Sequence, residues 1–160
     1  MPTKKIIKDF ALVVCGHGSR NSNYNKDLQK IKIKLEKKIN HDVYDCFIEI
    51  NKPSIEDCIS KIINKYKKVF FFPLLLFEGK HMIEDVNNQI YNLSKKFEKE
   101  IHLIEKLSLV DDILPHIKTI IGNFNFSECE MLITSCSYSK SKKVISELEE
   151  YTEKLSFSLN

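Results

Sequence analysis

A short apolar run that stops abruptly at a Gly-His-Gly sequence constrains the fold of this chain more than any other feature. The run covers residues 10–15, and Gly16, His17 and Gly18 follow it before an amphipathic pattern begins. This order is typical of a buried parallel strand that leads into a helix of an α/β sheet. A histidine in such a turn lies where these sheets bind ligands.

The alternation of short apolar runs and longer amphipathic runs continues along the chain. It predicts a doubly wound parallel α/β sheet of about five strands, folded as one domain. The expected strands cover residues 10–15, 43–50, 68–76, 101–105 and 130–135. Pro73 lies inside the third run and predicts a strand end or a bulge there, because proline donates no hydrogen bond to a ladder.

The tail resembles the start of the chain in a weaker form. Residues 131–140 align with residues 11–20, strand on strand, and a helical pattern follows both segments. Ser137 takes the place of the histidine, and both glycines are absent. We therefore predict a main unit over residues 1–125 and an extension over 126–160. The extension is either a truncated, degenerate second repeat or a chance likeness between two strand–helix units.

Charge and cysteine content exclude several classes of protein. The net charge of +3 suits an acidic small molecule and is far from the basic stripe of a nucleic-acid binder. Five cysteines without a CxxC pair indicate free thiols in a reducing cytoplasm rather than disulfides or a zinc knuckle. No segment approaches the about 18 apolar residues of a membrane span. We expect a soluble, cytoplasmic protein with neither a nucleic acid nor a membrane as partner.

Three acid–base side chains stand at the ends of consecutive predicted strands. They are His17, Glu49 and His81. Because parallel strands end at one edge of a sheet, we expect these groups to converge where ligands bind. An imidazole titrates near neutral pH, and a carboxylate beside it can accept a proton, hold its tautomer or share a metal ion. The pattern predicts an enzyme site for proton removal or metal binding.

Each candidate also has a purely structural interpretation. Glu49 can face solvent at a frayed strand end, and His81 can simply open a helix. Asp85, one helical turn later, can orient His81 or interact with the helix dipole. Ser19 and Arg20 can bind carboxylates of a ligand, or they can only cap and solvate a helix.

Three segments, in this order and spacing, resemble the sirohydrochlorin chelatases, which are class II tetrapyrrole chelatases. They are Val14–Arg20, Phe47–Ser54 and Phe72–His81, the last followed by Asp85. The resemblance covers about residues 8–122. It implies a flavodoxin-like α/β unit that inserts cobalt, iron or nickel into sirohydrochlorin without ATP.

The resemblance also implies roles for the candidate residues. His17 and His81 would bind the metal and remove protons, with Glu49 as the supporting carboxylate. The substrate-binding candidates are Ser19, Arg20, Gly79 and Asp85.

The implied partners are the tetrapyrrole and a divalent metal, with no cofactor beyond the substrate metal ion. We expect Co²⁺ ahead of Fe²⁺ and Ni²⁺, and a possible homodimer, since the shortest family members form one. The alternative is a non-catalytic carrier of the metal or the tetrapyrrole on the same fold. The sequence leaves open the physiological metal, the downstream pathway and the oligomeric state.

Overall fold

A computed structural model describes residues 7–76, 80–121, 133–135 and 141–158 of the chain. The chain divides into two compact units. One comprises residues 1–75 and 84–106, and the other comprises residues 76–83 and 107–160. The expected boundary near residue 125 lies outside the described residues, so the division into 1–125 and 126–160 stays a prediction.

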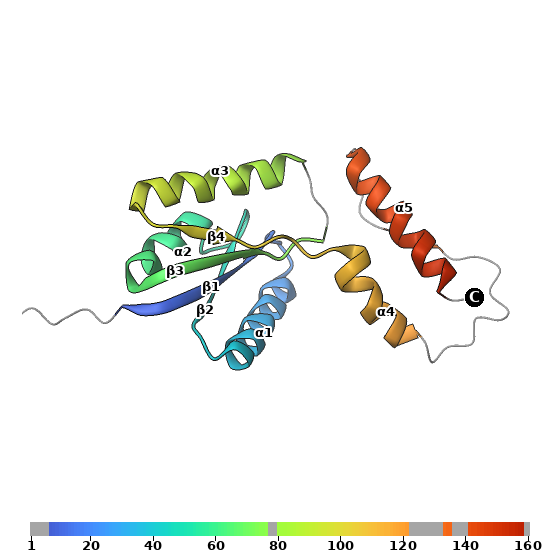
Figure 1. Ribbon diagram of the computed structural model, residues 1–160, viewed down its shortest axis with the longest axis horizontal. Helices are drawn as coiled ribbons and strands as arrows, with labels where there is room; N and C mark the ends of the chain where they lie inside the picture. Colours follow the sequence, from blue (N-terminus) through green and yellow to red (C-terminus); the bar gives the residue numbers. More distant parts are fainter. Residues whose placement is uncertain (1–6, 77–79, 122–132, 136–140, 159–160) are drawn as a thin grey trace, which may run out of the picture. The chain divides into compact units, whose positions relative to one another are not determined.

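The first unit is built on a parallel sheet with the strand order β2-β1-β3-β4 (Figure 1). The strands are β1 (Lys8–Gly16), β2 (Val43–Phe47), β3 (Tyr66–Pro73) and β4 (Ile101–Leu103). This order matches the first four positions of the flavodoxin-like order, so the predicted doubly wound α/β fold is confirmed. The strand β3 ends at Pro73, as proline's missing donor predicts.

The prediction of about five strands is wrong, because the described part of the chain holds four. Residues 130–132 of the fifth expected strand lie outside the described residues, and residues 133–135 form no strand. An apolar run becomes a strand only where a neighbouring strand can pair with it. Ile133 is 78% exposed, so this residue is not buried in a sheet.

Helices cover both faces of the sheet in the first unit. Figure 1 shows α2 (Ile55–Ile62) and α3 (Lys80–Phe97) on one side and α1 (Ser22–Ile39) on the other. On the α2 and α3 side, a buried cluster joins strand residues such as Val13 and Phe71 to the apolar faces of both helices. A smaller cluster on the other side packs Leu28 of α1 against β1 and β2. Burial on both faces explains the apolar runs of the central strands, residues 10–15 of β1 and 69–72 of β3.

Three cysteines meet inside the larger cluster. Cys15 and Cys46 are paired in register on β1 and β2, and Cys58 lies on α2; all three are buried, free thiols. Hydrogen bonds with Cys15 and Cys58, together with burial, raise the pKa of the Cys46 thiol. These three cysteines are free, as the cysteine pattern predicts.

The second unit contains α4 (Leu114–Ile121), α5 (Lys142–Phe157) and a π-helical turn, η2 (Leu109–Ile113). The helix expected after the repeat-like segment is present as α5, and its Val144 is buried. Most of that segment, residues 131–140, lies outside the described residues, so the second repeat stays a prediction. Across the described residues, no helix has the length and apolar character that crossing a membrane requires.

A capping box fixes the start of α2. The Ser54 hydroxyl accepts the Asp57 N–H at 3.2 Å, and the Asp57 carboxylate accepts the Ser54 N–H at 3.2 Å. This reciprocal pair satisfies two amide donors that a helix N-terminus otherwise leaves free. Hydrogen bonds from Ser54 and from the Lys52 ammonium lower the pKa of Asp57 to about 2.

We expect Asp57→Asn to destabilise the fold in a pH-dependent way. The folded pKa lies below the ordinary value of 3.8, so the carboxylate stabilises the folded state above about pH 4. That contribution is lost as the pH falls toward 2. Thermal midpoints at pH 7, 4 and 2 should show a gap between wild type and variant that closes on acidification. Asp27→Asn, which removes an exposed acid from α1, is the control. A gap of constant size would contradict the prediction.

Candidate functional site

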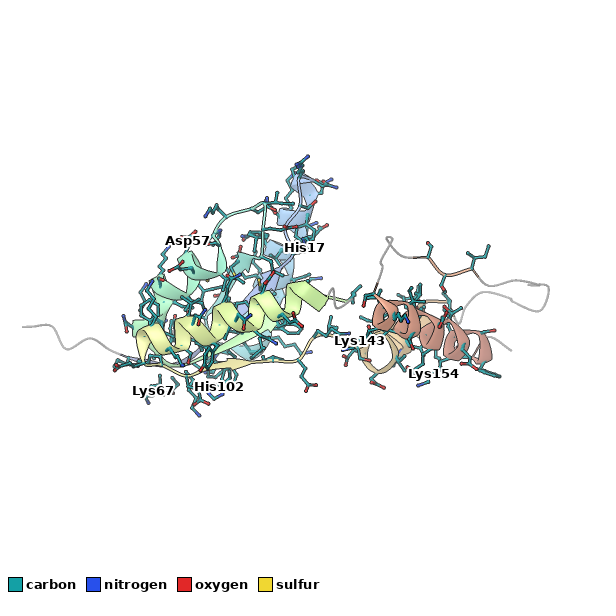
Figure 2. The ribbon with its side chains drawn as sticks, turned by 90° about the horizontal axis from the view of Figure 1, so that it is seen from above. His17, Asp57, Lys67, His102, Lys143 and Lys154 are labelled. Carbon is teal, nitrogen blue, oxygen red and sulfur yellow. The ribbon has the colours of Figure 1, made fainter. Side chains whose placement is uncertain are left out.

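His17 and Glu49 come together at the carboxyl edge of the sheet. His17 directly follows β1, and Glu49 lies two residues beyond the end of β2. The His17 Nδ1 lies 3.3 Å from the Glu49 Oε1, and the two side chains are 38% and 57% exposed. Figure 2 shows His17 far from Lys67, which lies near the start of β3. The side chains of His17 and Glu49 are therefore paired with each other and still open to solvent.

Main-chain hydrogen bonds also join the two turns that carry this pair, beyond the last paired residues of β1 and β2. The Ile48 N–H donates to the Gly16 carbonyl, and the Glu49 N–H donates to the His17 carbonyl, both at 3.0 Å. The two segments therefore stay side by side as far as His17, one residue beyond β1, and Glu49, two residues beyond β2. This main-chain ladder, rather than the side chains alone, brings the imidazole and the carboxylate together.

Gly18 is required by the close approach of the two turns. Its φ is +103°, and a Cβ built there would lie 1.9 Å from the Glu49 carbonyl oxygen. Any other residue would combine an unfavourable backbone conformation with a clash against main chain, which cannot move aside as a side chain can. Gly16 is less constrained, because its Cβ would meet mainly the hydroxyl of Tyr24, at 2.8 Å.

Asn51 ties the turn of Glu49 to the turn of His17. Its side-chain Oδ1 accepts the Ser19 N–H at 2.6 Å, and its own N–H donates to the Glu49 carbonyl at 2.7 Å. Sequence reasoning missed Asn51. The signal in the sequence is weak, a polar residue in the turn after a strand.

Tyr24 supports the other side of the His17 turn. Its hydroxyl accepts the His17 N–H at 2.9 Å, and its ring packs with the smaller core cluster. Sequence reasoning missed this residue too. Its spacing of four from Leu28 places it on the buried face of α1, which is the one signal that could have found it.

The structure describes the predicted substrate-binding residues in less detail than His17 and Glu49. The Ser19 hydroxyl accepts the Asn21 N–H at 3.1 Å, which favours its structural role in the loop before α1. Arg20 is exposed beside it. Asp85 is exposed on α3, one turn after position 81. Gly79 and the side chain of His81 lie outside the described part of the structure.

Of the three predicted site residues, His17 and Glu49 are therefore brought together, and the side chain of His81 lies outside the described part. Among the side chains that the structure describes, no group of three or more His, Cys, Asp or Glu residues is arranged to hold a metal ion. An imidazole nitrogen and a carboxylate oxygen are donors that suit first-row divalent metals such as cobalt, iron and nickel. The carboxylate also orients the imidazole, which is the requirement for a positioned proton acceptor.

A cavity of about 450 Å³ at the opposite edge of the sheet is a competing site. Its lining includes Lys8, Phe10, His41 and Asp42. Polar and aromatic side chains of this cavity already have partners within the protein. Lys8 forms an ion pair with Asp42, and His41 stacks on Phe10 with ring centroids 3.8 Å apart. Hydrogen bonds from Lys8 and from Tyr66 lower the pKa of Asp42. Because parallel α/β sheets bind ligands at the carboxyl ends of their strands, the His17 edge is the stronger candidate.

We expect Gly18→Ala to destabilise the first unit and to separate the His17 and Glu49 turns. The loss should exceed about 1 kcal/mol in the free energy of unfolding, because the added methyl group meets the Glu49 main chain at a positive φ. Gly16→Ala is the matched control and should cost less. Denaturant unfolding followed by circular dichroism measures both. Equal losses in the two variants would contradict the close contact of the turns.

The CbiX family model matches residues 11–121, which is more than half of the chain. The sirohydrochlorin cobaltochelatase of Methanococcus aeolicus is 33% identical over 78 residues, or 48% of this chain and 54% of that protein. The chain thus matches about half the length of this curated relative. The mitochondrial elongation factor Ts of Plasmodium chabaudi chabaudi is 25% identical over 118 residues, which cover 74% of this chain and 30% of that protein.

Two solved structures share the fold. The sirohydrochlorin chelatase SirB from Bacillus subtilis subspecies spizizenii, in complex with cobalt, gives a TM-score of 0.73 at 14% identity, covering 92% of this chain and 62% of that chain. A cobalamin (vitamin B12) biosynthesis CbiX protein from Marinobacter aquaeolei VT8 gives 0.62 at 18% identity, covering 71% and 94%. Because the family model matches more than half of the chain, the chain belongs to the CbiX family.

Proposed function

We propose that this chain inserts a divalent metal ion into sirohydrochlorin without ATP. The observation that carries the proposal is the pair of His17 and Glu49, 3.3 Å apart and open to solvent at the carboxyl edge of a CbiX-family sheet. The name of the Methanococcus aeolicus relative supports the same reaction.

The reaction requires two pyrrole N–H protons to leave the ring as the metal enters. A positioned base beside the ring lowers the barrier to proton removal, and His17 is suited to that role because Glu49 holds its ring. In the proposal, the imidazole and the carboxylate also receive the substrate metal ion. His81, at the start of α3, is proposed as the second imidazole.

Cobalt is the proposed physiological metal, with iron and nickel as alternatives. Nitrogen and oxygen donors bind all three ions along the usual affinity series, so the donor set alone does not choose among them. The cobaltochelatase name of the Methanococcus aeolicus relative favours cobalt.

The carboxylates of sirohydrochlorin need cationic and polar partners near the pair. Arg20 is the proposed partner, because it is exposed and follows the turn that carries His17. Ser19, Gly79 and Asp85 remain proposed substrate-binding positions. The free thiols favour a cytoplasmic location, and a homodimer is the proposed assembly.

We expect His17→Ala to lose metal insertion while keeping the fold. Removing a positioned base should slow insertion about 100-fold or more. The measurement is the anaerobic change in sirohydrochlorin absorbance with Co²⁺, Fe²⁺ or Ni²⁺ in turn, against a blank without protein. His116→Ala, an exposed histidine on α4, is the matched control and should be as active as wild type.

The same experiment separates the alternatives. Near-normal insertion by His17→Ala would overturn the site assignment. A shifted spectrum of bound ring, without acceleration by wild type for any of the metals, would replace the chelatase with a carrier of the ring.

A further inference from the structure

Ile50, which directly follows Glu49 in the chain, adopts a strained conformation. Its φ is +65°, and the Asn51 N–H donates to the Glu49 carbonyl at 2.7 Å, which makes Ile50 the centre of a γ-turn. A γ-turn with a positive φ at its centre is the rare and strained form. For a β-branched residue, a positive φ is a genuine outlier.

Contacts on both sides hold the strained turn in place. On one side, the Glu49 N–H donates to the His17 carbonyl, and the Glu49 carbonyl lies against Gly18. On the other side, the Asn51 side chain accepts the Ser19 N–H at 2.6 Å. The conformation of Ile50 is therefore imposed by the structure around the site, as strain at functional sites generally is.

The side chain of Ile50 is not explained by packing in the core. It is 59% exposed, whereas Ile48, two residues earlier, is partly buried against the larger core cluster. The turn alone does not require isoleucine either. Glycine or asparagine adopts a positive φ at lower cost, and neither exposes an apolar surface.

We propose that Ile50 is a substrate-contact residue whose apolar side chain packs on the face of the flat tetrapyrrole. This inference rests on the proposed function and names a contact for that ring. Small-molecule sites are mostly apolar, with a few polar groups that fix orientation. Here His17 and Glu49 are the polar groups, and Ile50, the residue that follows Glu49 in the chain, offers an exposed apolar side chain. Bound ring would cover apolar area that water covers in the free protein.

The test compares ring affinity in variants of the full chain. Ile50→Asn keeps a side chain of similar length, relieves the strain and removes the apolar surface. Ile50→Leu keeps the apolar surface. Ile33→Asn, at a 47% exposed isoleucine on α1, is the matched control. The probe is metal-free sirohydrochlorin, titrated by absorbance under anaerobic conditions, with the thermal midpoint of each variant measured in parallel.

We expect the Kd of Ile50→Asn to rise about tenfold, which corresponds to about 1.4 kcal/mol. Ile50→Leu and Ile33→Asn should bind the ring within about twofold of wild type, a difference of about 0.4 kcal/mol. The midpoint of Ile50→Asn should equal or exceed that of wild type, because the strain is relieved.

An unchanged Kd for Ile50→Asn would overturn the contact and leave the chelatase proposal standing. A lower midpoint for Ile50→Asn would also overturn it, since the side chain would then be needed for the fold. Wild type that fails to bind the ring would overturn both proposals. Wild type that binds the ring without accelerating insertion would overturn the chelatase alone, and the Kd values would still decide the role of Ile50.

Discussion

The position of β1 between β2 and β3 is the constraint on which the rest of the site depends. Its register places Cys15 opposite Cys46 on one side and opposite Pro73 on the other, so three strands end at nearly the same level. The main-chain hydrogen bonds then continue past the strands into the two turns of His17 and Glu49. A residue that follows an edge strand has a neighbouring strand on one side alone. His17 follows β1, which has a neighbouring strand on each side.

The strand-to-helix order and the two polar groups at strand ends could be predicted from the sequence because each rests on local signals. Apolar runs, glycines and a histidine in a turn are visible without knowledge of distant contacts. The same signals misplaced the end of β2. The sequence predicts a strand over residues 43–50, although β2 ends at Phe47. An exposed isoleucine in a turn, such as Ile50, and a buried isoleucine in a strand look alike in sequence.

The remaining features depend on contacts between distant parts of the chain. Asn51 binds the Ser19 amide across 32 positions, and no spacing rule links the two. Tyr24 reaches the His17 amide from the next helix. A positive φ at isoleucine contradicts local preference, so tertiary structure must impose it. Residues 133–135, the described part of the fifth expected strand, form no strand, and an apolar run alone does not show whether a partner strand is within reach.

The buried thiols of Cys15, Cys46 and Cys58 bear on which ions the edge of the sheet can meet. Thiolate, rather than thiol, is the form that binds metals, and the pKa of Cys46 is raised by its two neighbours and by burial. Under the proposed function, an ion that arrives at His17 and Glu49 meets nitrogen and oxygen donors, while the sulfurs of these three cysteines are buried in the core. The proposed chelatase would gain from this arrangement, because sulfur ligation would tend to retain an ion that has to pass to the ring.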